Sequence, residues 1–150
     1  MNTKANSRRG FSLIEIMIVV TIILVIATIA IPRLDSSRQL ANELAAVRMI
    51  HTLHTAQAQH YAQFGRYAPE LSKLGPLGAH LIPESLASGE HSGYRFVLSG
   101  SGNAYAVSVT PEQYGKSGRR TFYSDETGIL REHWGPEPAD VHSEEVKAKR

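Results

Sequence analysis

The sequence predicts an α+β protein in which a long N-terminal helix packs, over its second half, on a small antiparallel β-sheet head. Three patterns predict this. An apolar run fills residues 11 to 31, an amphipathic pattern with helical spacing follows it, and short alternating segments around glycine-rich turns fill the C-terminal part. The first half of the helix is long enough to span a membrane, which needs roughly 20 apolar residues.

The composition excludes several function classes. The chain has 150 residues and no cysteine, so it offers no thiolate for catalysis or metal binding. Its net charge of +2 includes the cations Lys4, Arg8 and Arg9, and without them 13 basic residues face 14 acidic ones. The basic charge is therefore weak grounds for a nucleic-acid partner, because phosphate binding needs clustered cations on the working surface. No catalytic motif emerges, so we predict neither an enzyme nor a cofactor.

The apolar run contains one carboxylate. Between Phe11 and Ile31 the non-apolar residues are Ser12, Glu15, Thr21 and Thr28. A carboxylate near the middle of a bilayer costs about 2.5 to 3.5 kcal/mol on insertion scales, so Glu15 is a functional candidate that needs a partner. The basic residues ahead of the run are typical of a segment that stays on the cytoplasmic side.

The junction between this basic leader and the apolar run carries a resemblance. Gly10-Phe11-Ser12-Leu13-Ile14-Glu15 resembles the processing site of type IV pilins and of the related pseudopilins of secretion systems. Pro32 stands where many of these proteins carry a helix-bending proline. The sequence-specific resemblance covers about the first 35 residues, and beyond them only the architecture is similar.

The resemblance implies a structural subunit of a type IV pilus or a pilus-like filament. A membrane prepilin peptidase/methyltransferase would cut after Gly10 and methylate the new N-terminus at Phe11. Glu15 would pair with the Phe11 ammonium of a neighbouring subunit and guide self-association into a helical filament. Membrane lipid would surround the helix before assembly by inner-membrane machinery. The head would then lie outside the cytoplasm, in an extracellular pilus or a periplasmic pseudopilus.

Other interpretations remain open. Within the family the alternative is a pseudopilin of a type II secretion system. A different class is a single-span anchor that presents a small binding head. An ordinary secretory signal usually has a shorter apolar run, although Ala27-Thr28-Ile29-Ala30 imitates its cleavage site. A twin-arginine export signal explains Arg8 and Arg9 but not Glu15. Glu15 also lies close enough to the membrane edge to reach the headgroup region.

The helix should continue beyond the apolar run. Pro32 removes a backbone donor and is expected to kink it. One face then repeats at steps of three and four residues and should be buried, and it consists of Ala46, Ile50, Leu53, Gln57, Tyr61 and Phe64. The opposite face should be exposed to solvent, and it consists of Arg48, Thr52, Thr55, Gln59 and Gln63. Gly65 suits the helix C-terminus, so the helix should run from residue 11 to 64.

The remaining elements follow in order. Residues 65–93 are predicted as a loop with short helical turns near 71–74 and 83–87. Strands are expected at 94–98 and 105–109 around a turn at 100–103, then at 121–124 and 129–132. The tail 133–150 should be mobile or loosely docked. This divides the chain into a leader (1–10), a membrane or filament-core helix (11–35), a head (36–132) and a polar tail (133–150).

Two clusters are weaker candidates for metal sites. His51, His54 and His60 lie along the predicted helix, but His51 and His60 project on opposite sides and no acid completes a ligand set. Asp125-Glu126-Thr127-Gly128 offers oxygen ligands for calcium, but four residues lack the spacing of a dedicated loop. We therefore interpret the histidines as solvated or packed, and the acidic segment as a turn. No metal site is predicted.

Overall fold

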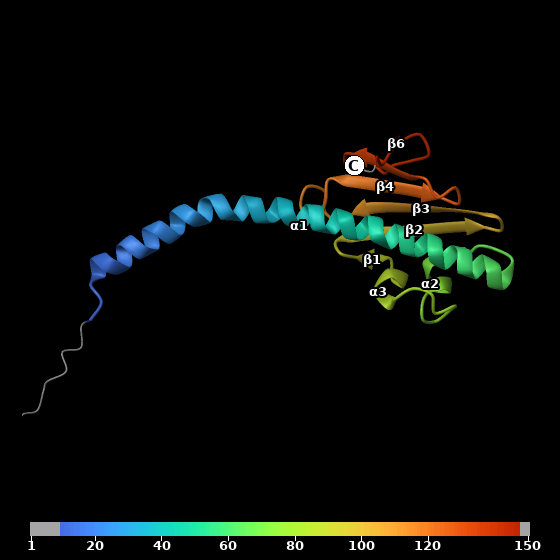
Figure 1. The fold of residues 1–150 in the computed structure, drawn as a ribbon, viewed down its shortest axis with the longest axis horizontal. Helices are drawn as coiled ribbons and strands as arrows, with labels where there is room; N and C mark the ends of the chain where they lie inside the picture. Colours follow the sequence, from blue (N-terminus) through green and yellow to red (C-terminus); the bar gives the residue numbers. More distant parts are fainter. Residues whose placement is uncertain (1–9, 148–150) are drawn as a thin grey trace, which may run out of the picture. The chain divides into compact units, whose positions relative to one another are not determined.

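A computed structural model describes residues 10–147, apart from the side chains of residues 30–32. The chain divides into two compact units, one ending at Ser36 and the other beginning at Ser37. The leader cations Lys4, Arg8 and Arg9 lie outside the described residues. The fold is α+β, as predicted, with one long apolar helix and one antiparallel sheet (Figure 1).

Helix α1 comprises Leu13–Phe64, a stretch of 52 residues. It ends as predicted at Gly65, which adopts φ 69° and donates its N–H to the Tyr61 carbonyl at 2.8 Å. In the apolar half, the hydroxyl groups of Thr21 and Thr28 donate to backbone carbonyls of the preceding turn, so they expose no unpaired donor. The helix continues through residue 32, and the kink expected at Pro32 stays a prediction.

The head contains six strands in the sheet order β1-β2-β3-β4-β5-β6, with every neighbouring pair antiparallel. The elements after α1 are α2 (Leu71–Leu74), α3 (Glu84–Ala87), β1 (Glu90–His91), β2 (Tyr94–Ser101), β3 (Ala104–Pro111), β4 (Arg120–Asp125), β5 (Leu130–Trp134) and β6 (Glu144–Glu145). The predicted hairpin is β2–β3, in which Ser101 pairs with Ala104 around a turn that contains Gly102 at φ 61°.

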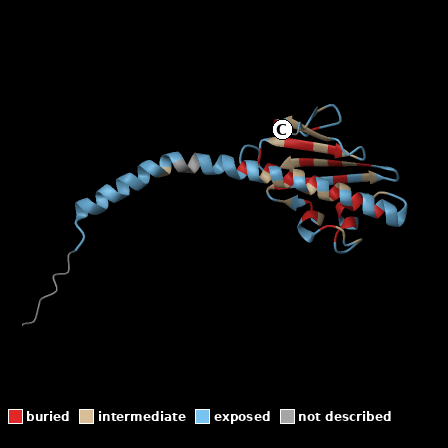
Figure 2. Ribbon diagram, in the orientation of Figure 1, coloured by how far each residue is buried: buried red, intermediate tan, exposed pale blue. Residues whose placement is uncertain are grey.

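The second half of α1 packs one face on the sheet, as the burial colours show (Figure 2). Ala46, Ile50 and Leu53 are fully buried against the inward-facing side chains of β2, β3 and β4. The prediction was wrong for the last turn, where Tyr61 is 40% exposed and Phe64 56% exposed. The reason is the chain reversal after Gly65, which covers the side of α1 that carries Gln57 and His60 instead.

Gln57 is the polar residue in the buried row of α1, and it makes a paired contact with the returning chain. Its Nε2 donates to the Ala68 carbonyl at 3.0 Å, and its Oε1 accepts from the Ala68 N–H at 2.8 Å. Both residues are fully buried. The amide therefore satisfies two buried backbone groups at once, much as a neighbouring strand would.

A second polar contact joins α1 to the far strands of the sheet. The Arg120 guanidinium contacts Glu43 on α1 at 2.8 Å and Glu132 on β5 at 2.6 Å. The other Glu43 oxygen accepts the Arg119 N–H at 2.9 Å. Because all three charged side chains are largely buried, removal of one partner would leave an uncompensated charge inside the head.

The C-terminal tail docks on the head more closely than predicted. Strand β6 pairs with β5, and the Val146 N–H donates to the Leu130 carbonyl at 2.9 Å. Ala139 is only 4% exposed, and the buried Thr121 hydroxyl donates to the Glu137 carbonyl at 2.8 Å. No pattern in the sequence predicts this docking, because the two glutamates of β6 show no apolar alternation.

His54 on α1 connects to β3 and β4 through both ring nitrogens. The Ser124 hydroxyl donates to the Ile129 carbonyl at 2.8 Å, so it accepts from His54 Nε2 at 2.9 Å. The other nitrogen, Nδ1, then accepts from the Tyr105 hydroxyl, which stays protonated because burial raises the pKa of Tyr105 to about 12. This arrangement suits a neutral imidazole.

Replacing Gln57 with leucine should destabilise the head strongly. Gln57→Leu leaves the Ala68 N–H and C=O buried without partners, and each such group costs about 1 to 3 kcal/mol. The matched control is Gln59→Leu, because Gln59 is exposed on the same helix. Chemical denaturation of the two variants gives the comparison. Equal unfolding free energies for both variants would contradict the assigned role of Gln57.

The stability of the head should fall on mild acidification. Burial, with a smaller contribution from His51, lowers the pKa of His54 from its ordinary 6.5, while Asp125 opposes the shift. The unfolded chain therefore takes up this proton at a higher pH than the folded chain. The stabilisation from neutral His54 is complete above pH 6.5 and is lost as the pH falls through the lowered pKa. Unfolding free energies measured across this range should show less pH dependence in His54→Gln than in the unmodified chain.

A suitable control for that experiment is His80→Asn, because His80 is exposed and has φ 59°, which asparagine tolerates. The control should keep the pH dependence of the unmodified chain. If His54→Gln also kept the pH dependence of the unfolding free energy, the hydrogen bonds of neutral His54 would not be the source of that dependence.

Candidate assembly site at the helix N-terminus

The start of α1 carries the residues that the sequence singled out. Gly10 is exposed, and a side-chain carbon added there would meet nothing within 4 Å. Phe11 is 80% exposed. The Ser12 carbonyl accepts the first helical hydrogen bonds, from the Glu15 N–H at 3.1 Å and the Ile16 N–H at 3.3 Å. The junction ahead of the helix is therefore exposed.

Glu15 lies in the first turn and folds back toward the helix start. Its Oε2 accepts from the Ser12 backbone N–H at 3.5 Å. A serine followed three residues later by a glutamate is the sequence signature of a capping box, and the sequence analysis missed it at Ser12. The contact is long for a hydrogen bond, so it satisfies the carboxylate only weakly.

A carboxylate has room for about four hydrogen bonds, and the Ser12 N–H supplies one of them within the described part of the chain. In water the other positions would be hydrated. In lipid, or between packed helices, they would lack donors, and the desolvated charge would be costly. The site is therefore chemically incomplete in an isolated subunit once water is removed.

The apolar half of α1 is mostly exposed in the described residues. One described helix holds an apolar stretch long enough to cross a membrane, and none of that stretch is buried. Most of its large side chains are about half exposed or more, including Leu13, Ile14, Met17, Ile18, Ile22, Ile23, Leu24, Val25, Ile26 and Ile29. Figure 2 shows this half almost entirely in the colour of exposed residues. Such a surface needs lipid or other helices around it.

The other candidate residues have separate structural roles. Asp125 Oδ1 accepts the Thr127 N–H at 3.0 Å, and Gly128 adopts φ 75°, as the turn interpretation requires. His54 bonds to Tyr105 and Ser124, His60 Nδ1 donates to the Arg66 carbonyl at 2.9 Å, and His51 is exposed. The described residues therefore contain no group of three or more histidines and acids that could hold a metal ion.

Comparisons with known proteins agree with this geometry. Residues 5–31 match the model of the prokaryotic N-terminal methylation motif. The chain is 32% identical over 113 residues to type II secretion system core protein G of Escherichia coli. This match covers 73% of this chain and 77% of that protein. It is 27% identical over 109 residues to the major component of the type IV wide pilus of Thermus thermophilus. This match covers 70% of this chain and 83% of that protein.

A third relative is the type IV major pilin of Myxococcus xanthus, 36% identical over 87 residues, which cover 58% of this chain but 36% of that protein. No solved structure gives a significant match. An uncovered apolar helix with a methylation motif at its start and an antiparallel head at its end defines a prepilin-like structural subunit. The chain belongs to the type IV pilin and pseudopilin family.

Proposed function

We propose that this chain is a prepilin that is cut between Gly10 and Phe11, methylated on the new N-terminus, and assembled into a type IV pilus. Before assembly, the mature chain crosses the inner membrane once, with residues 11–35 in lipid and the head outside the cytoplasm. In the filament, residues 11–35 form the core and the head faces outward. The role is structural and requires no catalytic group.

The observation that carries the proposal is the half-satisfied Glu15 inside an uncovered apolar helix. Cleavage after Gly10 would create an ammonium group on Phe11, one helical turn before Glu15. When neighbouring helices replace lipid around α1, burial of its apolar side chains contributes little free energy, because lipid is as apolar as leucine. A charge pair between Glu15 of one subunit and the Phe11 ammonium of the next would therefore strongly influence the register in which neighbouring helices pack. In making it, Glu15 exchanges a long contact with the Ser12 N–H for a charge-assisted one.

A pseudopilus is the second candidate, favoured by the similarity to core protein G over 77% of its length. The same cleavage, methylation and helix packing would serve it, and the filament would then be periplasmic. Electron microscopy of a strain that lacks this gene separates the two. Loss of surface filaments supports the pilus, and intact filaments with failed secretion support the pseudopilus.

The N-terminus of the membrane-extracted protein should be a methylated Phe11. Intact-mass and peptide mass spectrometry test this directly. Gly10→Ala should block processing, although the open space around Gly10 means that the change does not disturb the chain itself. Any loss of cleavage would therefore come from the peptidase cleft. Retention of Met1, or cleavage after Ala30, would contradict the prepilin assignment. The remaining interpretations would then be a single-span anchor or an export signal.

Replacing Glu15 should separate its two possible roles. Glu15→Gln keeps an oxygen that can accept the Ser12 N–H but removes the charge, while Glu15→Val removes both. If the charge pairs with a neighbour's Phe11 ammonium, both variants should insert and be cleaved after Gly10, yet both should be poorly incorporated into filaments. An ammonium without its carboxylate would be left in the apolar core.

Sheared filaments from cells that co-express variant and unmodified subunits report this incorporation. Normal incorporation of Glu15→Gln with failure of Glu15→Val would assign Glu15 to helix capping alone. Normal incorporation of both variants would mean that Glu15 has no part in assembly.

A further inference from the structure

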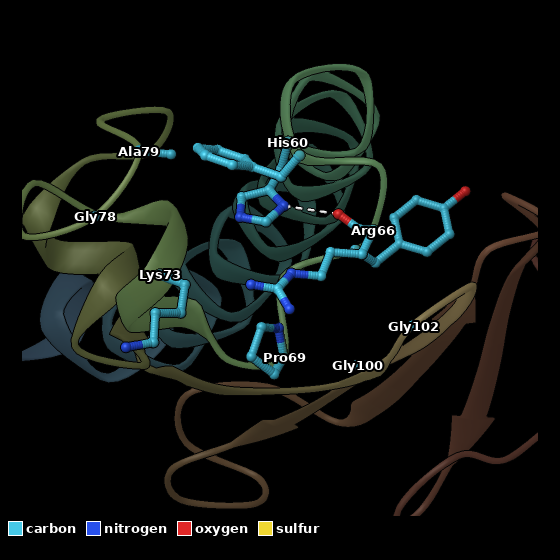
Figure 3. A pocket seen from close by; sticks show the side chains of 10 residues that line it. His60, Arg66, Pro69, Lys73, Gly78, Ala79, Gly100 and Gly102 are labelled. Atoms are coloured by element: carbon cyan, nitrogen blue, oxygen red, sulfur yellow. Dashed lines mark hydrogen bonds between the residues drawn. The ribbon is translucent and has the colours of Figure 1, made fainter.

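A cavity of about 410 Å³ lies at the C-terminal end of α1, far along the chain from the assembly site. Its walls come from the last turn of α1, the returning chain at residues 66–69, the segment after α2 and the β2–β3 turn (Figure 3). Cavities of roughly 300 to 1,000 Å³ are typical of small-molecule sites. The size therefore suits a small ligand rather than a polypeptide segment.

The charge of the cavity is positive. Arg66 and Lys73 are among its lining residues, and none of the ten lining residues carries a carboxylate. Figure 3 shows the Arg66 guanidinium between the His60 ring and Pro69. The Lys73 ammonium contacts Glu70 at 3.8 Å, but both side chains are more than half exposed, so this pair holds it only weakly.

His60 brings an accessible imidazole nitrogen to the wall of the cavity. The residue is only 8% exposed, and its Nδ1 must donate to the Arg66 carbonyl at 2.9 Å, because a carbonyl only accepts. This leaves Nε2 on the cavity side of the ring (Figure 3), with no hydrogen-bond partner among the described residues. Within the described residues no buried side-chain nitrogen or oxygen lacks a partner, so Nε2 is reached by solvent and is accessible to a ligand through the cavity.

The remaining wall is apolar. The Phe64 ring packs on the His60 ring with centroids 4.6 Å apart, and Phe64 is 56% exposed at the cavity rim. Pro69 forms another side of the cavity. A bound molecule would thus meet cations and an imidazole nitrogen together with flat hydrocarbon surface.

We propose that this cavity binds a small organic anion. Its carboxylate or phosphate oxygens would contact Arg66 and Lys73, and its planar or apolar part would lie against Phe64 and Pro69. His60 Nε2 accepts a ligand hydroxyl when the ring is neutral and donates to the anion when the ring is protonated. The proposal does not depend on filament assembly. The competing explanation is that Arg66 only balances the partial negative charge at the end of α1.

The test uses the full chain in non-ionic detergent with ¹⁵N-labelled histidine, and His60→Gln assigns the His60 signals. Three probes are titrated: benzoate, its uncharged isostere benzamide, and acetate, which carries the charge without the ring. Benzoate should shift the His60 signals saturably and bind about tenfold or more tightly than either comparison probe, since a hydrogen bond to a charged group is worth roughly one tenfold step or more.

Arg66→Gln and Lys73→Gln should each weaken benzoate binding, Arg66→Gln by about tenfold or more. Arg95→Gln is the matched control, because Arg95 is an exposed cation on β2 that pairs with Glu90 and does not line the cavity. It should bind benzoate normally. The proposal is overturned if benzoate gives no saturable shift, if it binds no better than benzamide or acetate, or if Arg66→Gln binds it as well as Arg95→Gln does.

Discussion

The uncovered apolar surface of α1 is the constraint on which the rest of the molecule depends. The large side chains from Phe11 to Ile29 are exposed. The subunit must therefore find its burial elsewhere, first in lipid and then among helices of its own kind. Because apolar contact does not distinguish these surroundings well, polar groups decide which neighbour is correct. In the proposed assembly Glu15 is that group, because its contact with the Ser12 N–H is weak.

The head has no disulfide, so noncovalent contacts must stabilise its fold. Side chains of α1 do this by reaching across the sequence to backbone and charged groups of the sheet. Glu43 contacts Arg120, 77 residues away, and His54 contacts Ser124, 70 residues away. Gln57 satisfies both backbone groups of Ala68. These contacts hold the second half of α1 on the sheet with specific geometry.

Sequence patterns predicted the parts of this fold that repeat, and missed the parts that depend on distant chain. The long helix and the β2–β3 hairpin follow from periodicity and turn residues. Tyr61 and Phe64 fit the helical period, yet the chain reversal covers His60 instead, and no local pattern shows where that reversal packs. The Glu43–Arg120–Glu132 cluster and strand β6 join segments far apart in sequence. At the candidate site, the roles of Gly10, Phe11 and Glu15 follow from the motif and stay predictions, while the contact between Ser12 and Glu15 fits a capping-box pattern that the sequence also contains.

The central claim is that Glu15 of one subunit faces the Phe11 ammonium of another inside the filament. Solid-state NMR on filaments assembled from a mixture of two labelled populations tests it most directly. One population carries ¹⁵N at the Phe11 amine, and the other carries ¹³C at the Glu15 carboxylate, so any transfer must cross between subunits. We predict an intersubunit contact between the two labels at salt-bridge range, about 4 Å. Its absence from the mixture, with a contact seen only when both labels share one subunit, would contradict the account.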